Sequence, residues 1–359
     1  MTHHTPRHTR RRLRTVVICT VVGLAFALTP LGLAGSAEGA TLRVRLGVVS
    51  VSTMYAGSDY AGEAAQVSGV GASSIRIPAK WNLIQPGAAA AYNWSQLDQA
   101  VRAARTEGLD VLLNLEGPAP VWAQKPGADP LANGNAPLDP QDFRTFARAV
   151  ALRYSPYVFA WEIWNEPNLS HYLIPPTADE YLPLLRAAYS GIRSSGATQP
   201  IITGGTSSSR GDTRDISFIE RLYLLGGRPY IDGIGVHPYT FPYPLLNDPR
   251  FGDGGGAAVL RWIRSAMLAA GEGNKKVWIT EFGQPTGTSS MSVSEAKQAS
   301  IVTDALSLAN SADWVAAIFI FNSHDLVAGP SILDGNMGLY RHDGTPKPVV
   351  AAITSLTGG

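Results

Sequence analysis

Two glutamates stand out because each lies at the end of an apolar run rather than on a polar face. Glu166 lies in AWEIWNEPN (residues 160–168), and Glu281 lies in VWITEFG (277–283). A buried strand needs neither carboxylate, and Pro167 removes a hydrogen-bond donor and so stops a strand after Glu166. Two such carboxyl groups, one protonated and one ionised, can donate a proton to a leaving oxygen and attack a carbon centre.

Eight short apolar runs recur along the chain, and a segment of helical periodicity follows each of them. Most are continuous rather than alternating, which is typical of strands buried on both faces. They cover residues 42–50, 73–79, 109–117, 158–167, 201–208, 231–239, 276–283 and 315–322.

The intervening segments carry signals for helix starts and ends. Asp139 and Pro140 fit the N-cap and the first position of a helix, and Gly108 closes the helical pattern that precedes it. The stretches TADE (177–180) and SVSE (292–295) are predicted capping boxes. Together these signals indicate helices that alternate with the strands.

This alternation predicts an α/β fold, a single (β/α)8 TIM barrel over residues 41–359. A doubly wound open sheet is the alternative, but no glycine-rich phosphate turn follows the first run. In a barrel the chemistry lies at the carboxyl ends of the strands, so Glu166 and Glu281 are expected to face one cavity. Such a pair suits glycoside hydrolysis, whereas each acid alone could also form a rim salt bridge.

The stretches WEIWNEPN and ITEFG, with HPY (237–239) between them, resemble the clan A glycoside hydrolases. The resemblance is closest to family 39, with the cellulase-like family 5 next, and covers essentially all of residues 41–359. It implies that Glu166 is the general acid/base and Glu281 the nucleophile of a retaining mechanism. It also implies that Asn165 binds the sugar 2-hydroxyl.

Three further residues match the clan by position. Arg76 resembles the arginine that keeps the nucleophile ionised, and a core ion pair with Glu162 is its alternative. Tyr239 is expected to bond Glu281. His237 is expected to orient the site or the sugar.

The floor and walls of the site are less well specified. Trp122 could stack on a sugar or pack in the core. The last run lacks the tryptophan that many clan members place beneath the reacting sugar, so Asn322, Phe321 or His324 is expected to line that floor. Loops 117–139 and 240–255 are rich in proline, glycine and aromatics, which suits the walls of a cleft.

These features predict a retaining glycoside hydrolase that cleaves a neutral β-linked polysaccharide or oligosaccharide, with endo action. The residues after the last run are too few for the β-sandwich that family 39 xylosidases carry, so we do not expect an exo-xylosidase. Alternatives are an exo-acting, β-xylosidase-like enzyme, a sugar-binding barrel without catalysis, and a barrel hydrolase whose acids do other work. A gathering of four cations at the rim would instead favour uronic acids: Lys80, Lys125, Arg210 and Arg214.

Residues 1–40 have the basic, apolar and small-residue regions of a secretory signal peptide, with a retained membrane anchor as the alternative. Thr9–Arg11 leaves both the general secretory and the twin-arginine routes open.

Without this leader the chain has 24 basic and 27 acidic residues, a net charge of −3, which argues against a nucleic-acid partner. The only cysteine, Cys19, lies in the leader. We expect a secreted monomer that needs no metal or other cofactor and has no stable membrane association.

Overall fold

The computed structural model describes Met1 and residues 42–54, 57–88, 91–208, 214–249, 256–326, 329 and 331–358. The predicted leader lies outside these residues except for Met1. Glu38–Gly359 forms one compact unit, separate from Met1–Ala37. Among the described residues, no helix has both the length and the apolar character that a membrane span requires.

Parallel strands form one sheet that closes on itself. Its order is β5-β4-β3-β2-β1-β9-β8-β7-β6, and β5 also pairs with β7. The strands are β1 (Arg45–Val49), β2 (Ser74–Lys80), β3 (Asp110–Glu116), β4 (Val158–Ile163), β5 (Ile201–Thr203), β6 (Thr206–Ser207), β7 (Gly233–His237), β8 (Lys276–Phe282) and β9 (Val315–Ile320).

The closed sheet is a (β/α)8 barrel, as predicted. β5 and β6 are two parts of one strand position, because only Gly204 and Gly205 separate them and both parts pair with β7. Parallel pairing of β1 with β9, in which Val48 lies opposite Ile320, joins the first strand to the last. An open doubly wound sheet has no such pairing and is therefore wrong.

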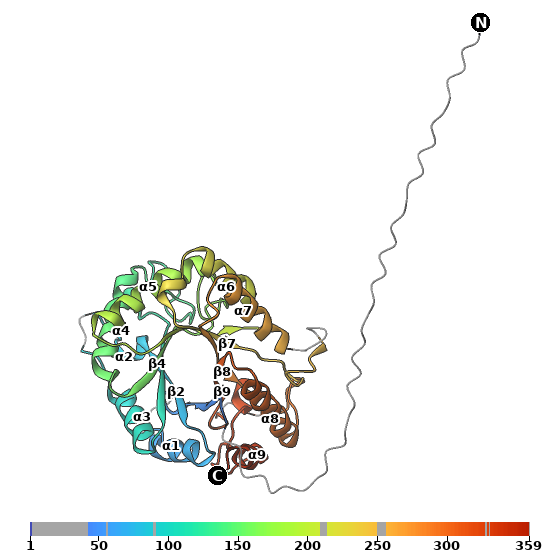
Figure 1. Ribbon diagram of the computed structural model, residues 1–359. Helices are drawn as coiled ribbons and strands as arrows, with labels where there is room; N and C mark the ends of the chain where they lie inside the picture. Colours follow the sequence, from blue (N-terminus) through green and yellow to red (C-terminus); the bar gives the residue numbers. More distant parts are fainter. Residues whose placement is uncertain are drawn as a thin grey trace. The chain divides into compact units, whose positions relative to one another are not determined.

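Helices surround the strands, and Figure 1 shows this ring with the strands at its centre. The helices are α1 (Tyr60–Gly69), α2 (Trp81–Ile84), α3 (Ser95–Thr106), α4 (Pro140–Tyr154), α5 (Ala178–Ser194), α6 (Asp215–Leu224), α7 (Ala257–Ala269), α8 (Glu295–Ser311) and α9 (Pro348–Thr357). Short 3-10 turns lie at Ser52–Met54, Val121–Ala123, Arg228–Tyr230 and Asp334–Asn336.

Two of the predicted helix starts are confirmed and one is wrong. The Asp139 side chain accepts from the amide of Gln141 at the start of α4, and Thr177 caps α5. The capping box at 292–295 is displaced, because α8 begins at Glu295 with Ser294 as its cap. The amides of residues 292 and 293 already donate to loop carbonyls, so the chain enters the helix two residues later.

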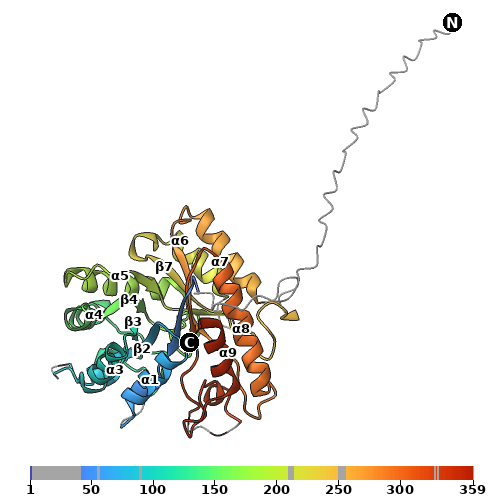
Figure 2. The same cartoon turned by 60° about the horizontal axis from the view of Figure 1, so that its bottom comes forward.

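The core has two parts, one between helices and strands and one inside the barrel. The helices cover the outer face of the strands, as the tilted view in Figure 2 shows. Inside the barrel, Leu112, Ala160 and Trp278 pack with Phe319. At Gly47 a Cβ atom would lie 2.3 Å from the Phe319 ring, so only glycine fits opposite this side chain. This apolar layer supports the polar residues at the carboxyl ends of the strands.

Candidate active site

A cavity of about 290 Å³ opens at the carboxyl ends of the strands. Both predicted catalytic acids, Glu166 and Glu281, line it. The cavity is also lined by Arg76, Lys80, Glu116, Asn165, Tyr172, Tyr239, Phe321 and Asp334. With Val49 of β1 and Ser207 of β6, which also line the cavity, residues from all eight strand positions meet at one site, as in other barrels.

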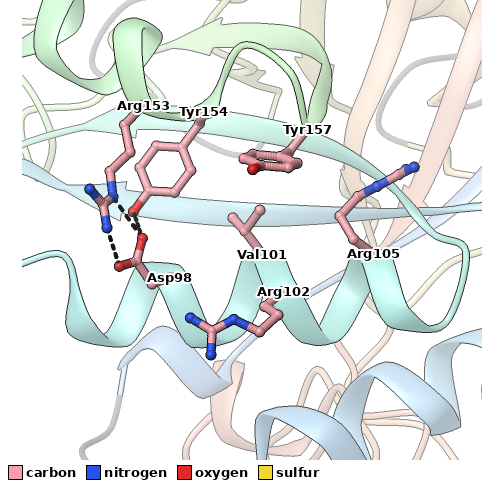
Figure 3. Close-up of a pocket in the computed structure, with 7 residues that line it drawn as sticks. All are labelled: Asp98, Val101, Arg102, Arg105, Arg153, Tyr154 and Tyr157. Atoms are coloured by element: carbon pink, nitrogen blue, oxygen red, sulfur yellow. Dashed lines mark hydrogen bonds and ion pairs between the residues drawn. The ribbon is translucent and has the colours of Figure 1, made fainter.

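Another hollow, of about 400 Å³, lies between α3 and α4, away from these acids (Figure 3). Its carboxylate, Asp98, accepts from Arg153 Nε at 2.8 Å and from the Tyr154 hydroxyl at 2.8 Å. The bonds from Arg153 and Tyr154 lower the pKa of Asp98 despite its partial burial. This hollow therefore has one satisfied acid and not the pair that acid/base chemistry needs.

Glu166 reaches the cavity because the backbone leaves the extended conformation after β4. Trp164 and Glu166 have positive φ angles of 70° and 37°, which non-glycine residues rarely adopt. The Asn114 side chain donates to the Trp164 carbonyl at 2.8 Å, and the Trp164 indole donates to the Tyr172 carbonyl at 2.7 Å. These contacts hold the strained turn, so that Asn165 and Glu166, although adjacent, both face the cavity.

A similar irregularity places Glu281. The register between β8 and β9 shifts between Ile279 and Phe282, so strict in-and-out alternation stops there. Phe282 packs in the outer core, while Thr280 and Glu281 both contact residues of the site. A bulge is thus the device that aims the second acid into the cavity.

Arg76 connects the two sides of the site, and its side chain is almost completely buried. It donates to Glu281 Oε1 at 2.7 Å, to Glu162 Oε2 at 2.5 Å and to Asn165 Oδ1 at 2.9 Å. Burial disfavours its charge, but Glu162 and Glu281 outweigh this and raise the pKa of the guanidinium. Both interpretations of Arg76 from the sequence are therefore correct, because Arg76 pairs with Glu281 and also forms a core ion pair with Glu162.

His237 lies between the acids and is fully buried. Its Nδ1 atom lies 2.9 Å from Glu166 Oε1 and 3.6 Å from Glu281 Oε2, while Nε2 lies 3.0 Å from Thr280 Oγ1. Burial works against the charged imidazolium, but Glu281 and Glu166 outweigh it and raise the pKa of His237. Since His237 does not line the cavity, it orients Glu166 rather than the sugar.

Tyr239 donates its hydroxyl to Glu281 Oε2 at 2.8 Å. Burial first, and then the charges of Glu281 and Glu166, raise the pKa of this phenol well above its ordinary value, so it stays a donor. Glu281 thus accepts one bond on each oxygen, from Arg76 and from Tyr239. Two donors of this kind hold the Glu281 carboxyl group in one orientation.

The two acids lie close together. One oxygen of Glu166, one oxygen of Glu281 and a ring nitrogen of His237 all lie within 4.8 Å of one another. This spacing matches the short separation of a retaining pair, about 5–5.5 Å, rather than the wider gap of an inverting pair. The same three groups could hold a metal ion by spacing alone, which the sequence did not indicate, but Arg76 and Tyr239 already occupy the Glu281 oxygens.

Besides His237, two expected substrate-binding residues do not line the cavity. The Trp122 indole donates to the Gln85 carbonyl at 3.1 Å and packs edge-on against Trp81, which is the core role. Asn322 is fully buried, and its neighbour Phe321 lines the cavity instead. At the carboxyl end of β9, the Phe321 side chain lines the cavity in which a sugar would lie, and the Asn322 side chain does not.

The alternative of a cationic rim is not supported among the described residues. Lys80 lines the cavity, Lys125 pairs with Glu180 at 2.8 Å, and Arg214 is exposed at the start of α6. Arg210 lies outside the described residues. Uronic-acid binding by these four cations therefore has no support in the described part of the chain.

Three acidic or phenolic groups of the cavity were not predicted from the sequence. Glu116 pairs with Lys80 at 2.6 Å across the ends of β2 and β3. Asp334 and Tyr172 come from the loops after β9 and β4. Burial, followed by the charge of Glu281, raises the pKa of Asp334. Only Glu116, at the end of a predicted strand, had a position that could have signalled a role.

The closed barrel and its two strand-end glutamates define the architecture of a clan A glycoside hydrolase. The family model "Cellulase (glycosyl hydrolase family 5)" matches residues 46–324, and the chain belongs to this family. No relative among the curated proteins matches the sequence. The motifs resemble family 39 first and family 5 second, and the family match falls on family 5.

Solved structures of both families share the fold. A family 39 glycoside hydrolase from Bacteroides cellulosilyticus WH2 has a TM-score of 0.69 at 24% identity, over 89% of this chain and 64% of that one. A monomeric β-xylosidase from Caulobacter crescentus CB15 has a TM-score of 0.64 at 18% identity, over 89% and 68%. A GH5_18 variant from Streptomyces cattleya, in complex with Manβ1-4GlcNAc, has a TM-score of 0.67 at 17% identity, over 88% and 80%. This chain thus spans less than two thirds of the Bacteroides enzyme.

Proposed function

We propose that this protein is a retaining β-glycosidase in which Glu281 is the nucleophile and Glu166 the general acid/base. The observation that carries the proposal is the arrangement of the two acids. Their nearest oxygens lie within 4.8 Å, and Glu281 alone is held by Arg76 and Tyr239. Different surroundings give two carboxyl groups different roles.

In the first step Glu281 attacks the anomeric carbon, and the bond from that carbon to the leaving oxygen breaks. Glu166 donates its proton to the leaving oxygen, so that the departing sugar is neutral. His237 Nδ1 lies 2.9 Å from Glu166 Oε1. With a proton on Nδ1 the imidazole donates to Oε1, which leaves Oε2 for the proton that is transferred. Asn165 accepts from Arg76 through Oδ1, so its amide group can donate to the sugar 2-hydroxyl.

In the second step a water molecule attacks the same carbon, and the bond to Glu281 breaks. Glu166, now a carboxylate, takes the proton from that water, as microscopic reversibility requires. Both steps invert the anomeric centre, so the product keeps the configuration of the substrate. Arg76 and Tyr239 stabilise the carboxylate that Glu281 becomes again.

The proposed substrate is a neutral β-linked polysaccharide or oligosaccharide, which the enzyme cleaves at internal linkages. Among the described residues that line the cavity, the carboxyl groups of Glu116, Glu166, Glu281 and Asp334 outnumber the cations Arg76 and Lys80. A negative cavity disfavours anionic sugars. Exo action is the second candidate, because the cavity is compact and because a structural relative is named as a β-xylosidase.

The catalytic proposal is tested with a panel of aryl β-glycosides on the parent, Glu281→Gln and Glu166→Ala. Without Glu281 no glycosyl-enzyme forms, so turnover should vanish on every substrate. Without Glu166, activated leaving groups should keep partial reactivity, and azide should restore turnover by attacking the intermediate without a base. Equal losses on all leaving groups and no azide rescue would contradict the assignment, and a parent without any activity would favour the sugar-binding barrel.

Endo action is tested by following viscosity and product size on a panel of polysaccharides. Rapid shortening of the chains with little monosaccharide supports it. Release of monosaccharide alone, from chain ends, would replace it by exo action.

A further inference from the structure

The hollow between α3 and α4, called the α3–α4 hollow below, is separate from the active-site cavity (Figure 3). Its lining residue Tyr157 directly precedes β4, whereas Glu166 follows the other end of the same strand. Because β4 has six residues at about 3.3 Å each, the strand separates the two positions by roughly 20 Å. A ligand of the size of one sugar cannot touch both Tyr157 and Glu166, so this hollow is not part of the reaction centre.

Arginines from both helices line the α3–α4 hollow. Arg102 and Arg105 come from α3, and Arg153 comes from the last turn of α4. Asp98 is the one carboxylate among the described lining residues, and Arg153 pairs with it. The guanidinium groups therefore outnumber the carboxylates, although residues 41–359 have a net charge of −3. Such a local excess of positive charge attracts anions.

Arg102 is the guanidinium that is available to a ligand. It is exposed, and its side chain forms no ion pair or hydrogen bond within the part of the chain that the structure describes. It also borders a neighbouring hollow with Asp59 and Glu107, but neither acid pairs with it. Arg105, in contrast, donates to Asp110 at 3.3 Å. The hollow thus offers about one unpaired positive charge, in the planar form that binds a carboxylate with two hydrogen bonds.

An aromatic and aliphatic surface lies beside this charge. Tyr157 is 49% exposed, and Figure 3 shows its ring over Val101 of α3. The amide of Tyr157 donates to the carbonyl of Tyr154 at 2.8 Å, which fixes the turn that presents the ring. The volume of about 400 Å³ is within the range of small-molecule sites, which combine apolar walls with a few polar groups. An exposed tyrosine ring suits the apolar face of a sugar, because a tyrosine is apolar on its faces and polar at its tip.

We propose that the α3–α4 hollow binds a uronic-acid unit of an acidic polysaccharide, with the sugar ring on Tyr157 and the carboxylate on Arg102. One carboxylate per sugar matches the one unpaired guanidinium. Duplex DNA carries a charge about every 1.7 Å, which requires several unpaired cations, whereas the described residues of this hollow offer one. A bare phosphate would leave Tyr157 and Val101 uncovered. The site goes beyond the proposed function, because it attaches the protein to an acidic polymer while the active-site cavity acts on neutral linkages.

Native electrophoresis in a gel that contains polygalacturonate measures this binding, and a gel with the carboxyl-reduced polymer is the neutral counterpart. The parent should be retarded by the acidic polymer and much less by the neutral one, and added salt should weaken the retardation. Arg102→Gln removes the unpaired charge without breaking an ion pair. The dissociation constant for polygalacturonate should therefore rise about tenfold in this variant. Tyr157→Ala should weaken binding in the same direction.

The matched control is Arg261→Gln on α7, where the arginine is also exposed, has no side-chain partner among the described residues and lines neither the hollow nor the cavity. This control should bind polygalacturonate as the parent does. Equal retardation of the parent, Arg102→Gln and Arg261→Gln would overturn the site. Because polymer held in the active-site cavity contributes equally to all three proteins, their difference reports the α3–α4 hollow.

Competition experiments identify the ligand. Galacturonate oligomers should displace the parent from the polymer more effectively than inorganic phosphate at equal concentration, or than a DNA oligonucleotide of equal charge. Better competition by phosphate would show that the sugar ring is not recognised, and better competition by DNA would assign the hollow to nucleic acid; either result overturns the proposal.

Binding and hydrolysis are separate measurements. Arg102→Gln should hydrolyse aryl β-glycosides as the parent does, which also shows that the variant is folded. A parent that is retarded but cleaves no glycoside would contradict the proposed function and leave this site in place. An active parent that the acidic polymer does not retard would contradict this site alone.

Discussion

The Nδ1 atom of His237, whose side chain is fully buried, lies 2.9 Å from Oε1 of Glu166. This contact joins the end of β7 to the turn after β4, and Thr280 holds the other ring nitrogen at 3.0 Å. The imidazole of His237 therefore links Glu166, the proposed acid/base, to Thr280 on β8. Two predictions concern this contact.

His237 should titrate above its ordinary pKa of about 6.5, because Glu281 and Glu166 outweigh its burial. NMR of the histidine ring nitrogens as a function of pH measures this directly. Glu281→Gln and Glu166→Gln should each lower the His237 pKa relative to the parent. Since the folded-state pKa is raised, the associated stability is present below about pH 6.5 and is lost as pH rises through the folded value. A pKa that does not respond to either variant would contradict the electrostatic cause.

Gly205→Ala should impair catalysis without removing any reactive group. A Cβ atom at this position would lie 2.1 Å from His237 Nε2, so the imidazole must move. We expect kcat/KM to fall on the order of 100-fold, most strongly for poor leaving groups that need the proton of Glu166. Gly69→Ala in α1 is the matched control, because a Cβ atom there meets nothing within 4 Å. A Gly205→Ala enzyme as active as Gly69→Ala would show that the His237 position does not matter.

Arg76→Met should destabilise the barrel as well as abolish activity. It leaves Glu162 and Glu281 without their shared cation in the interior, which costs about 3–5 kcal/mol of unfolding free energy. Urea unfolding measures this loss. The double variant Arg76→Met/Glu162→Gln should recover part of the stability but none of the activity. Full stability in Arg76→Met would contradict the ion-pair network.

We also propose that the protein is exported, with a mature N-terminus near residues 37–41. Intact-mass measurement of the protein from the culture medium gives this terminus. A leader retained in the exported protein would favour the membrane anchor instead. Protein found only inside the cell would contradict export.

The order of strands and helices followed from the sequence because each element has a local signal. Continuous apolar runs marked the strands, and Asp139 and Thr177 marked helix starts that the structure retains. The strand-end positions of Glu166 and Glu281 then followed from the rule that barrel chemistry lies at the carboxyl ends. The helix start predicted at Ser292 was wrong because a loop can carry the capping-box sequence while its amides donate to loop carbonyls.

Side-chain direction was harder to predict, because contacts between distant segments decide it. Alternation along a strand does not place Glu281, since a bulge against β9 turns Thr280 and Glu281 into the site together. The direction of Glu166 depends on a turn that Asn114, from the neighbouring strand, holds. Trp122 is an aromatic residue of a kind that can stack on a sugar ring, but it packs against Trp81 instead. None of these partners is visible in a local pattern.

The central claim is that Glu281 forms a covalent bond to the sugar, and one measurement tests it most directly. Glu166→Ala, which lacks the base for the second step, is mixed with the aryl β-glycoside that the parent cleaves best, quenched with acid and analysed by mass spectrometry. We expect a mass increase of one glycosyl unit, located by peptide mapping on Glu281. An adduct on another residue, or rapid release of the aryl group with no adduct on any peptide, would contradict it.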